Sequence, residues 1–513
     1  MRVSILILLF FKLSTLAQNP ISETEKEFAE FAEQEKKAFD DYKQKENEAI
    51  SAFLKDRWQA YERMNATPYP FKPVPIEIPK TIPEPIEQPD ANKLPIIFPK
   101  KEATGNPKVN HTPENIEEEN SIGNQKGDPN ISDAKNLSQI NKEKENEVKL
   151  TFQAETFSLK SNLIYYGTTI PIGYEKDLLV HCNSPDENGV SEYWQSLSKK
   201  NYWRLTGQIE WLRAKYKLND WGTYNLVKLF SETIMNDRND QICFQFFFMN
   251  QLSYDIRLAK SGNELVLLIP FKEMTYAMSY LELNNKKFYI TKETNSSFYT
   301  FNKNLMKDQK DISLLIDQPI LFTEAPEKKQ FKLKSGKEIT VEYSLHMVEF
   351  LKGYPQAELD VLFNSNPSSI LSQSLIQQLS PLLSGMNEWE AVNFLLEFVQ
   401  HQFSYKTDAE QFEKEKWFFP EDQLHYPYSD CEDRSVFFAY LVKKLLQLDV
   451  IGLNYPEHVA TAIHFHGNVK GDKVTYKGKT YSICDPTYIG ASAGMCMPQF
   501  KSVKPKVIEV TKD

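Results

Sequence analysis

The 513-residue sequence has few cysteines, no excess of basic residues and no long apolar run after its N-terminus. Its five cysteines are scattered and odd in number, so they do not form the framework of a disulfide-stapled domain, and at least one thiol should be free. No cysteine pair has CxxC spacing, and the histidines do not cluster with cysteines at the intervals of a zinc site. The formal net charge of −10 argues against a nucleic-acid partner. A transmembrane segment is not expected either, because that needs roughly 18 continuous apolar residues.

Residues 1–17 have the features of a secretory signal peptide. Arg2 supplies a positive start, residues 4–11 are apolar, and Ala17 ends a small-residue cleavage site. The apolar run is too short to cross a bilayer and Lys12 interrupts it, which favours a cleaved signal over an anchor. We therefore expect an exported protein, in the periplasm, at the cell surface or secreted.

The next two segments differ from the rest in composition. Residues 22–65 lack proline and glycine and carry aromatic residues at helical spacing, which predicts an amphipathic helix, although its large aromatics suit a regular coiled coil poorly. This helix could bind a cell-envelope partner or pack on itself, or it could be a plain helical spacer. Residues 66–147 are first proline-rich and then rich in Asn, Lys, Glu and Ser. That composition predicts an extended spacer followed by a disordered linker.

The remaining sequence intermixes strand-like alternation with helical runs, which predicts an α+β fold. Two stretches resemble each other: NDWGTYNLVKLF begins at Asn219 and NEWEAVNFLLEF begins at Asn387. Continuing the alignment sets Asp255 against Asp449, Glu264 against His458 and Lys292 near Asp485, and it sets Asp237 or Arg238 opposite Cys431. A repeat of this length indicates a duplicated domain. We expect domains at 148–350 and 351–513, the first a degenerate, non-catalytic copy of the second.

Cys431 follows a loop-like run and begins an apolar helix. Unpaired N–H groups and the helix dipole at such a position favour a thiolate and can hold an oxyanion. The neighbouring carboxylates of Asp430, Glu432 and Asp433 oppose thiolate formation, and Arg434 offsets them in part. The cysteine is therefore a candidate nucleophile.

Three histidines compete as its base: His458, His464 and His466 share one face of a predicted strand. If the following strand returns antiparallel around a turn at Gly471, His458 lies opposite Asp485 and His464 lies near Lys479. We therefore expect His458 to be the general base and Asp485 to orient it, with His464 and His466 at the surface or in supporting positions. Cys484 should point to the opposite face, into the core.

At these residues the sequence resembles the transglutaminase-like superfamily, whose fold is a circularly permuted papain-like fold. The resemblance is carried by DCEDR at Cys431, HVATAI at His458 and CDPTY at Asp485, within residues 380–500. It implies thiol-dependent acyl transfer by a Cys–His–Asp triad, and many bacterial members are similar to peptidases or amidases. Two departures stand out, because no aromatic residue follows the histidine and Ser429 replaces a usual glycine. Trp417, His425 and Tyr426 are the candidate oxyanion donors.

The sequence thus predicts an exported cysteine peptidase or amidase that acts on protein or peptide amides, with water as the default acyl acceptor. No cofactor or metal is expected, since the acidic residues near Cys431 do not form an EF-hand loop. The alternative is a non-catalytic surface or scaffold protein that keeps the fold for binding.

Overall fold

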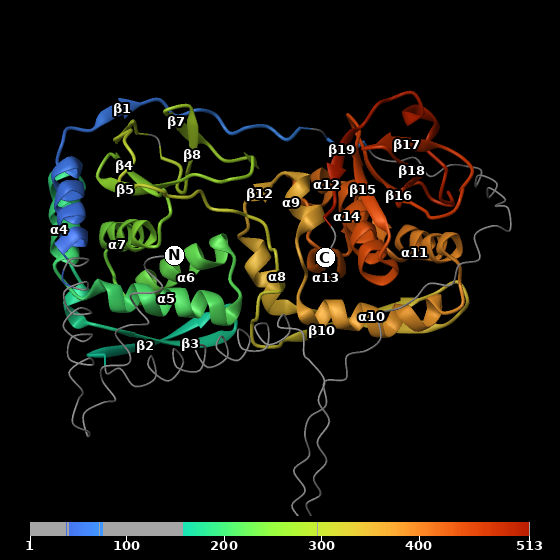
Figure 1. Ribbon diagram of the computed structural model, residues 1–513, viewed down its shortest axis with the longest axis horizontal. Helices are drawn as coiled ribbons and strands as arrows, with labels where there is room; N and C mark the ends of the chain where they lie inside the picture. The colour runs from blue at the N-terminus through green and yellow to red at the C-terminus, as the bar shows by residue number, and fades with distance from the viewer. Residues whose placement is uncertain (1–36, 38–40, 71, 75–156, 295, 512–513) are drawn as a thin grey trace, which may run out of the picture. The chain divides into compact units, whose positions relative to one another are not determined.

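A computed structural model describes residues 37, 41–70, 72–74, 157–294 and 296–511 (Figure 1). The chain divides into two compact units, and every helix and strand reported below belongs to the larger one, which comprises residues 1–96 and 158–513. The predicted signal peptide and most of the predicted linker lie outside the described residues. None of the described helices is long and apolar enough to cross a membrane.

The first half of the larger unit consists of a β-hairpin, four helices and a sheet. The hairpin and helices are β2 (Leu159–Tyr165), β3 (Thr168–Tyr174), α4 (Glu187–Ser198), α5 (Tyr202–Tyr216), α6 (Asp220–Ile234) and α7 (Arg238–Gln251). The later strands are β4 (Arg257–Ser261), β5 (Glu264–Ile269), β6 (Thr275–Tyr276), β7 (Tyr280–Leu283), β8 (Lys286–Ile290) and β9 (Phe298–Thr300). The sheet has the order β1-β9-β4-β5-β8-β7, with β1 (Gln59–Tyr61) added from the N-terminal segment, and α7 packs on β4 and β5.

The second half begins with another hairpin and ends in another sheet. Its first elements are β10 (Pro326–Lys332), β11 (Glu338–Ser344), α8 (Leu345–Lys352), β12 (Gln356–Ala357), α9 (Leu359–Asn364), α10 (Ser369–Leu383), α11 (Glu388–Gln402) and β13 (Ser404–Tyr405). Then follow α12 (Asp408–Phe412), α13 (Pro420–His425), β14 (Tyr428–Ser429), α14 (Cys431–Leu441), β15 (Asp449–Asn454), β16 (Val459–His464), β17 (Lys473–Tyr476), β18 (Lys479–Cys484) and β19 (Lys506–Glu509). The sheet order is β17-β18-β16-β15-β19, and α14 packs on β15 and β16. The mixture of helices and antiparallel sheets confirms the α+β class.

The two sheets share their strand order and their register. The order β7-β8-β5-β4-β9 in the first half matches β17-β18-β16-β15-β19 in the second, and all these neighbours are antiparallel. Leu268 pairs with Ile290 in the first half, and Ala462 pairs with Ile483 in the second. These residues stand at equal distances along the chain from the aligned Glu264 and His458 and from the aligned Lys292 and Asp485. The repeat seen in the sequence therefore has a counterpart in strand pairing.

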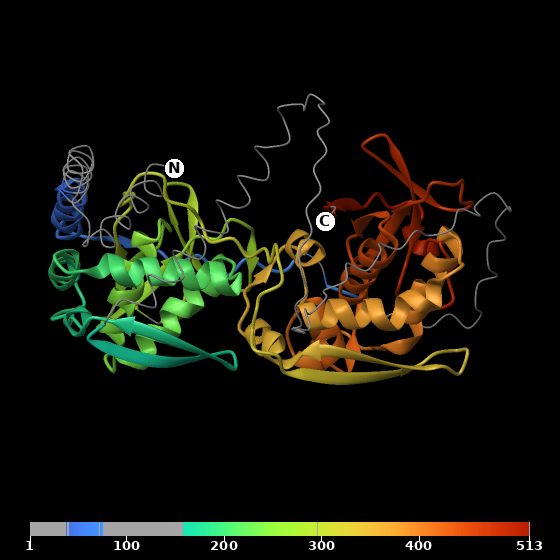
Figure 2. The same ribbon diagram turned by 60° about the horizontal axis from the view of Figure 1, so that its bottom comes forward.

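The helices of the two halves also correspond to each other. Asn219 caps α6 by accepting a hydrogen bond from Gly222 N at 2.9 Å, and Asn387 caps α11 by accepting one from Glu390 N, also at 2.9 Å. An N-cap side chain satisfies an amide that has no partner within its own helix, which is why both helices begin where they do. In Figure 2, each hairpin lies beside a helix, β2–β3 along α5 and β10–β11 along α10. Because β10–β11 packs on α10, the second half starts near Pro326, before the predicted residue 351.

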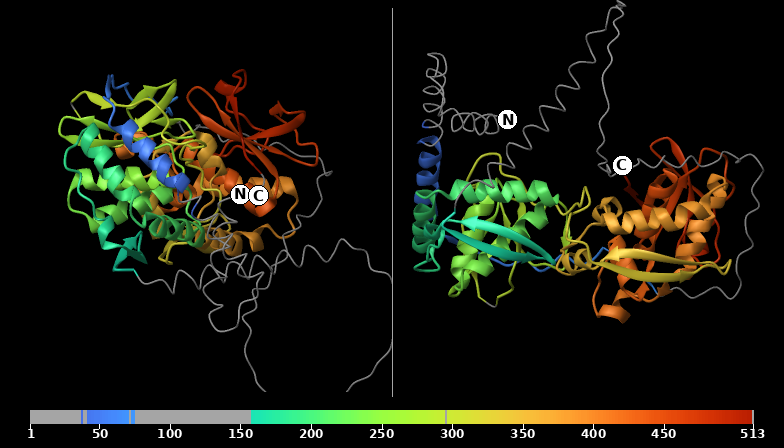
Figure 3. Two further views of the ribbon diagram at one scale, coloured as in Figure 1. Left: turned by 60° about the vertical axis from the view of Figure 1, so that its left-hand side comes forward. Right: turned by 90° about the horizontal axis from the view of Figure 1, so that it is seen from below.

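The N-terminal helix ends earlier than predicted and docks on the same chain (Figure 3). The described helix covers residues 41–54, and residues 59–61 form β1, so the helical segment predicted for 22–65 is wrong at its C-terminal end. Asn47 Oδ1 accepts a hydrogen bond from the buried Trp194 indole at 3.0 Å, and Ser51 Oγ lies 3.1 Å from Ser191 Oγ. These contacts place against α4 the buried face of the helix, which carries Asn47, Ile50, Ser51 and Leu54.

The start of the predicted linker is also held on the protein. Thr67 O accepts a hydrogen bond from Ala277 N at 3.1 Å. The Tyr69 ring packs against Tyr276 and Trp417, with centroids 5.7 and 5.4 Å apart. Val74 O accepts a hydrogen bond from the Tyr405 hydroxyl at 3.3 Å. We call residues 59–74 the arm, because it contacts both halves. The remainder of the predicted linker, 75–147, lies outside the described residues.

Candidate active site

Cys431 is the first residue of α14, as predicted, and it is 1% exposed. Asp430 precedes the helix, and its backbone N–H donates to the Asp433 carboxylate at 3.2 Å, which fixes the entry of the chain. Every residue of α14 is buried, since the helix lies between the sheet and α11 and α13. The thiol therefore belongs to the interior of the second half.

His458 and Asp485 meet at the edge of the pair β16–β18. His458 comes directly before β16, Asp485 comes directly after β18, and the two strands are antiparallel. His458 Nε2 lies 2.8 Å from Asp485 Oδ2, and both side chains are 3% exposed. His464 lies at the other end of the strand, with Nδ1 2.9 Å from Thr480 O. The structure thus brings together the histidine and aspartate chosen from the sequence and sends His464 elsewhere.

The Asp485 carboxylate is fixed from several sides. Its Oδ1 accepts hydrogen bonds from Thr487 N at 2.9 Å and from Tyr488 N at 3.1 Å. Gln400 on α11 donates to the Asp485 carbonyl at 3.1 Å, a contact that the sequence did not point to. Since Oδ2 engages Nε2 of His458, Nδ1 is the ring nitrogen left for proton transfer. The His458 ring stacks on Phe500, with centroids 5.0 Å apart and planes at 12°.

Cys431 is tied to the same strand end. Ser435 Oγ, one turn further along α14, donates to Val459 O at 2.9 Å. The Val459 backbone N–H is close enough to the Cys431 sulfur to act to lower the thiol pKa. Cys431 therefore lies against the residue that directly follows His458, and the Asp485 carboxylate is close enough to influence its pKa as well.

The thiol is neutral in this arrangement. Burial, and then the charge of Asp430, raise the pKa of Cys431 well above its ordinary value despite the Val459 contact. The Cys431 thiol donates a hydrogen bond to Glu432 Oε2 at 3.1 Å. Burial is thus the largest obstacle to a thiolate, and of the three carboxylates that the sequence marked as unfavourable, Asp430 adds to it whereas the contact with Glu432 acts in the opposite direction.

A buried acidic cluster surrounds the cysteine. Asp408, Asp430 and Glu432 place one carboxylate oxygen each within 4.8 Å of one another, a spacing that could hold a cation. Burial raises the pKa of Asp408 to about 9, and burial with mutual repulsion raises the pKa of Asp430 and Glu432 well above the ordinary range. Protons on the cluster therefore offset part of this repulsion.

Glu421 on α13 is a buried carboxyl outside the acidic cluster, and its raised pKa predicts that the stability of the protein depends on pH. Its Oε1 accepts a hydrogen bond from Ser368 N at 2.6 Å, and burial raises its pKa from 4.5 to about 7. Because the pKa of Glu421 is higher in the folded protein, the folded protein keeps a proton that the unfolded chain releases. The contribution of this group to stability is therefore lost as pH rises from about 4.5 through about 7. Glutamine does not ionise, so Glu421→Gln avoids this loss of stability. The unfolding free energy of the variant minus that of the wild type, measured by urea titration, should therefore increase by about 3 kcal/mol between pH 4 and pH 8.

Glu338→Gln on the exposed side of β11 is the control, and its relative stability should not change over the same pH range. An equal pH response in both variants would contradict the assignment to Glu421.

The three candidate oxyanion donors are not equivalent. Trp417 is 1% exposed, and its neighbour Phe418 N donates to Asp433 Oδ1 on α14 at 2.9 Å, so this segment borders the helix of Cys431. His425 instead faces Tyr343, with Nδ1 3.4 Å from the hydroxyl. Tyr426 stacks on Phe418, with centroids 5.0 Å apart. The structure brings the Trp417 segment to the helix of Cys431, with Tyr426 packed against Phe418 of that segment, and directs His425 toward Tyr343.

Arg434 and Tyr405 are further residues of the site that the sequence did not identify in these roles. The Arg434 guanidinium is 1% exposed and donates to Phe403 O at 2.6 Å. It lies over the Tyr405 ring at 5.3 Å, and Tyr405 pairs with Ser429, two residues before Cys431. Arg434 therefore supports the loop that enters α14, a role that depends on contacts between distant segments.

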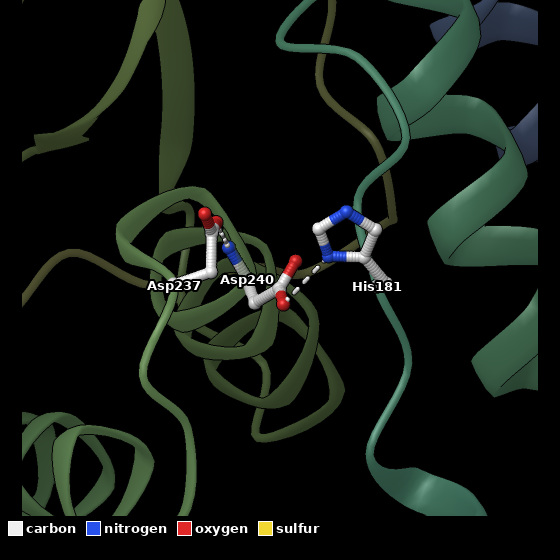
Figure 4. Close-up of side chains that lie close together, drawn as sticks. All are labelled: His181, Asp237 and Asp240. Atoms are coloured by element: carbon white, nitrogen blue, oxygen red, sulfur yellow. Dashed lines mark hydrogen bonds and ion pairs between the residues drawn. The ribbon is translucent and has the colours of Figure 1, made fainter.

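The corresponding positions of the first half carry other groups. Glu264 and Lys292, aligned with His458 and Asp485, form an ion pair of 2.6 Å at the surface. Arg238 begins α7 where Cys431 begins α14, so the thiol is replaced as well. Figure 4 shows His181 facing Asp240, 3.0 Å apart, beside Asp237, the N-cap of α7.

Comparisons with known proteins give no information about the function of this site. No family model, no curated protein and no solved structure matches this chain.

Proposed function

We propose that the second half is a thiol-dependent acyl-transfer enzyme of transglutaminase-like type, acting outside the cytoplasm as a peptidase or amidase on protein or peptide amides. One observation carries this proposal: the buried 2.8 Å contact between His458 and Asp485 lies at the strand end against which Cys431 packs. A nucleophile, a base and a group that orients the base are the parts such chemistry requires.

The geometry supports one order of steps. His458 Nδ1 takes the thiol proton of Cys431, and the thiolate attacks the amide carbonyl to form a tetrahedral adduct. N–H groups in the first turn of α14 stabilise the oxyanion. The adduct collapses to a thioester as His458 returns the proton to the leaving amine. Water, deprotonated by His458, then hydrolyses the thioester and restores the thiol.

We further propose that the first half is a non-catalytic copy of the second. The shared strand order and register support this, and the replacement of all three groups by Arg238, Glu264 and Lys292 accounts for the loss of chemistry. In this view the first half contributes binding or stability, and the reaction belongs to the second half alone.

The test is the alkylation rate of Cys431 by iodoacetamide near neutral pH, read by mass spectrometry at the Cys431 peptide. Wild-type Cys431 should react at least about 10-fold faster than in His458→Ala, because the imidazole assists thiolate formation. His464→Ala is the matched control on the same strand and should leave the rate unchanged. If Cys431 reacts no faster than a free cysteine and His458→Ala makes no difference, the enzyme proposal fails.

A second candidate function is a non-catalytic surface or scaffold protein that retains the fold for binding. It is favoured by the Cys431 thiol, which is 1% exposed and hydrogen-bonded to Glu432. Under this alternative, Cys431 resists alkylation in the folded protein, and His458→Ala leaves both labelling and partner binding intact.

A further inference from the structure

Cys182 and Cys243 come together in the first half, although 60 residues of chain lie between them. Cys182 lies between β3 and α4, and its backbone N–H donates to Asp240 Oδ1 at 2.6 Å. Asp240 and Cys243 are three residues apart on α7, which places them on one face of that helix. The hydrogen bond from Cys182 thus sets its side chain beside that of Cys243.

The two thiols are in contact. They are close enough for each to shift the pKa of the other, and they are 6% and 1% exposed. The Tyr193 hydroxyl, which donates to Asp240 O at 3.4 Å, is close enough to both sulfurs for them to affect its pKa. Cys182 Sγ also donates to Ser184 O at 3.2 Å, so its orientation is fixed by the loop. The three other cysteines belong to the second half.

We propose that Cys182 and Cys243 are a disulfide-forming pair, which an oxidising compartment converts into a bond between the loop before α4 and helix α7. Two neighbouring thiol sulfurs must approach further to reach the S–S length of about 2.0 Å, and rotation of the two side chains can supply that movement. The bond would close a loop of roughly 60 residues, a size for which cross-linking restricts the unfolded chain strongly.

The step needs a small disulfide, such as oxidised glutathione, as oxidant. The hydrogen bond from Cys243 lowers the pKa of Cys182, whereas burial raises that of Cys243, so Cys182 is the attacking thiolate. It attacks one sulfur of the oxidant, releases a thiol and forms a mixed disulfide. Cys243 then loses its proton, attacks the Cys182 sulfur and releases the second thiol. Two protein thiols are oxidised and one oxidant disulfide is reduced to two thiols.

A metal site does not explain this arrangement. His181, Asp237 and Asp240 place possible ligand atoms within 4.8 Å of one another, as Figure 4 shows for their side chains. The carboxylates of Asp237 and Asp240 already accept backbone hydrogen bonds, from Asn239 and Asp240 N–H and from Cys182 N–H respectively. The pairing of the cysteines is independent of the function proposed for Cys431, because it involves the other half of the unit.

The test uses the full chain, purified with reductant, exchanged into buffer without it and treated with oxidised glutathione. The protein is then denatured in iodoacetamide and mapped by mass spectrometry without reduction. We expect one cross-linked peptide pair joining Cys182 to Cys243 and alkylation of the three remaining cysteines. Oxidation should raise the melting temperature by about 5 °C, and dithiothreitol should reverse the shift.

Two variants sharpen the result. Cys243→Ala should accumulate glutathione on Cys182 and show no melting shift, whereas Cys484→Ala in the second half should cross-link like the wild type. Alkylation of all five cysteines in oxidised wild-type protein, or a cross-link between any other pair, would overturn the proposal. That readout needs only the wild-type chain, so it decides the matter even if a variant does not fold.

Discussion

Asp485→Asn is expected to lower the rate of acyl-enzyme formation by about 10³- to 10⁴-fold. Asp485 Oδ2 accepts the Nε2 proton of His458, which leaves a lone pair on Nδ1 for the Cys431 thiol. An asparagine can donate its amide N–H to Nε2 instead, which moves the imidazole proton to Nδ1 and removes the base. The measurement is the release of nitrophenol from an activated acyl ester, with the acyl adduct on Cys431 confirmed by mass.

Asp449→Asn is the control for this substitution. Asp449 starts β15 at the far end of the same sheet and pairs with Lys479, so the rate should change less than about twofold. Cys431→Ser should abolish the adduct. Equal losses in Asp449→Asn and Asp485→Asn, or full activity in Asp485→Asn, would remove Asp485 from the mechanism.

Arg434→Met is expected to destabilise the protein by about 3–5 kcal/mol. The guanidinium is buried beside Asp430 and Asp433, donates to Phe403 O at 2.6 Å, and contacts Ser429 Oγ at 3.4 Å. Methionine fills much of the same space but leaves the Phe403 carbonyl without this donor and Asp433, whose pKa is about 7, without a counter-charge. Urea unfolding at pH 7, followed by tryptophan fluorescence, measures the change.

The matched control is Arg238→Met, at the corresponding turn of the first half. The Arg238 side chain is 41% exposed, and its ion pair with Glu232 spans 3.4 Å. A surface ion pair contributes little, so its loss should cost less than about 1 kcal/mol. Similar losses in the two variants would show that the burial of Arg434 does not matter to stability.

The pairing of His458 with Asp485 was accessible from the sequence because strand geometry is regular. Residues two apart share a face, and a tight turn forces the next strand to run antiparallel, so the first residue of one strand meets the last of the other. The same alternation along the strand predicted that Cys484 points into the core, and this residue is 0% exposed. The alignment of Glu264 with His458 likewise anticipated the register that the two sheets share.

Contacts between distant segments account for what the sequence did not show. Residues 59–61 have a helix-compatible composition, yet they pair with β9 because the edge of that sheet offers unpaired backbone groups. The arm has a linker's composition, but a few aromatic contacts and hydrogen bonds hold it in place. The neutral state of Cys431 depends first on how deeply the cysteine itself is buried and then on the nearby Asp430, and no local pattern reveals the burial.

The arm also holds the N-terminal segment on the rest of the protein without help from the linker that joins them. A single cut anywhere between residues 75 and 156 divides the polypeptide in two, but the shorter piece still carries the helix over residues 41–54, β1 and Tyr69. Each of these is attached to the longer piece by buried side chains or strand pairing. The two fragments should therefore co-purify until they are denatured. They can also be produced separately and tested for reassembly.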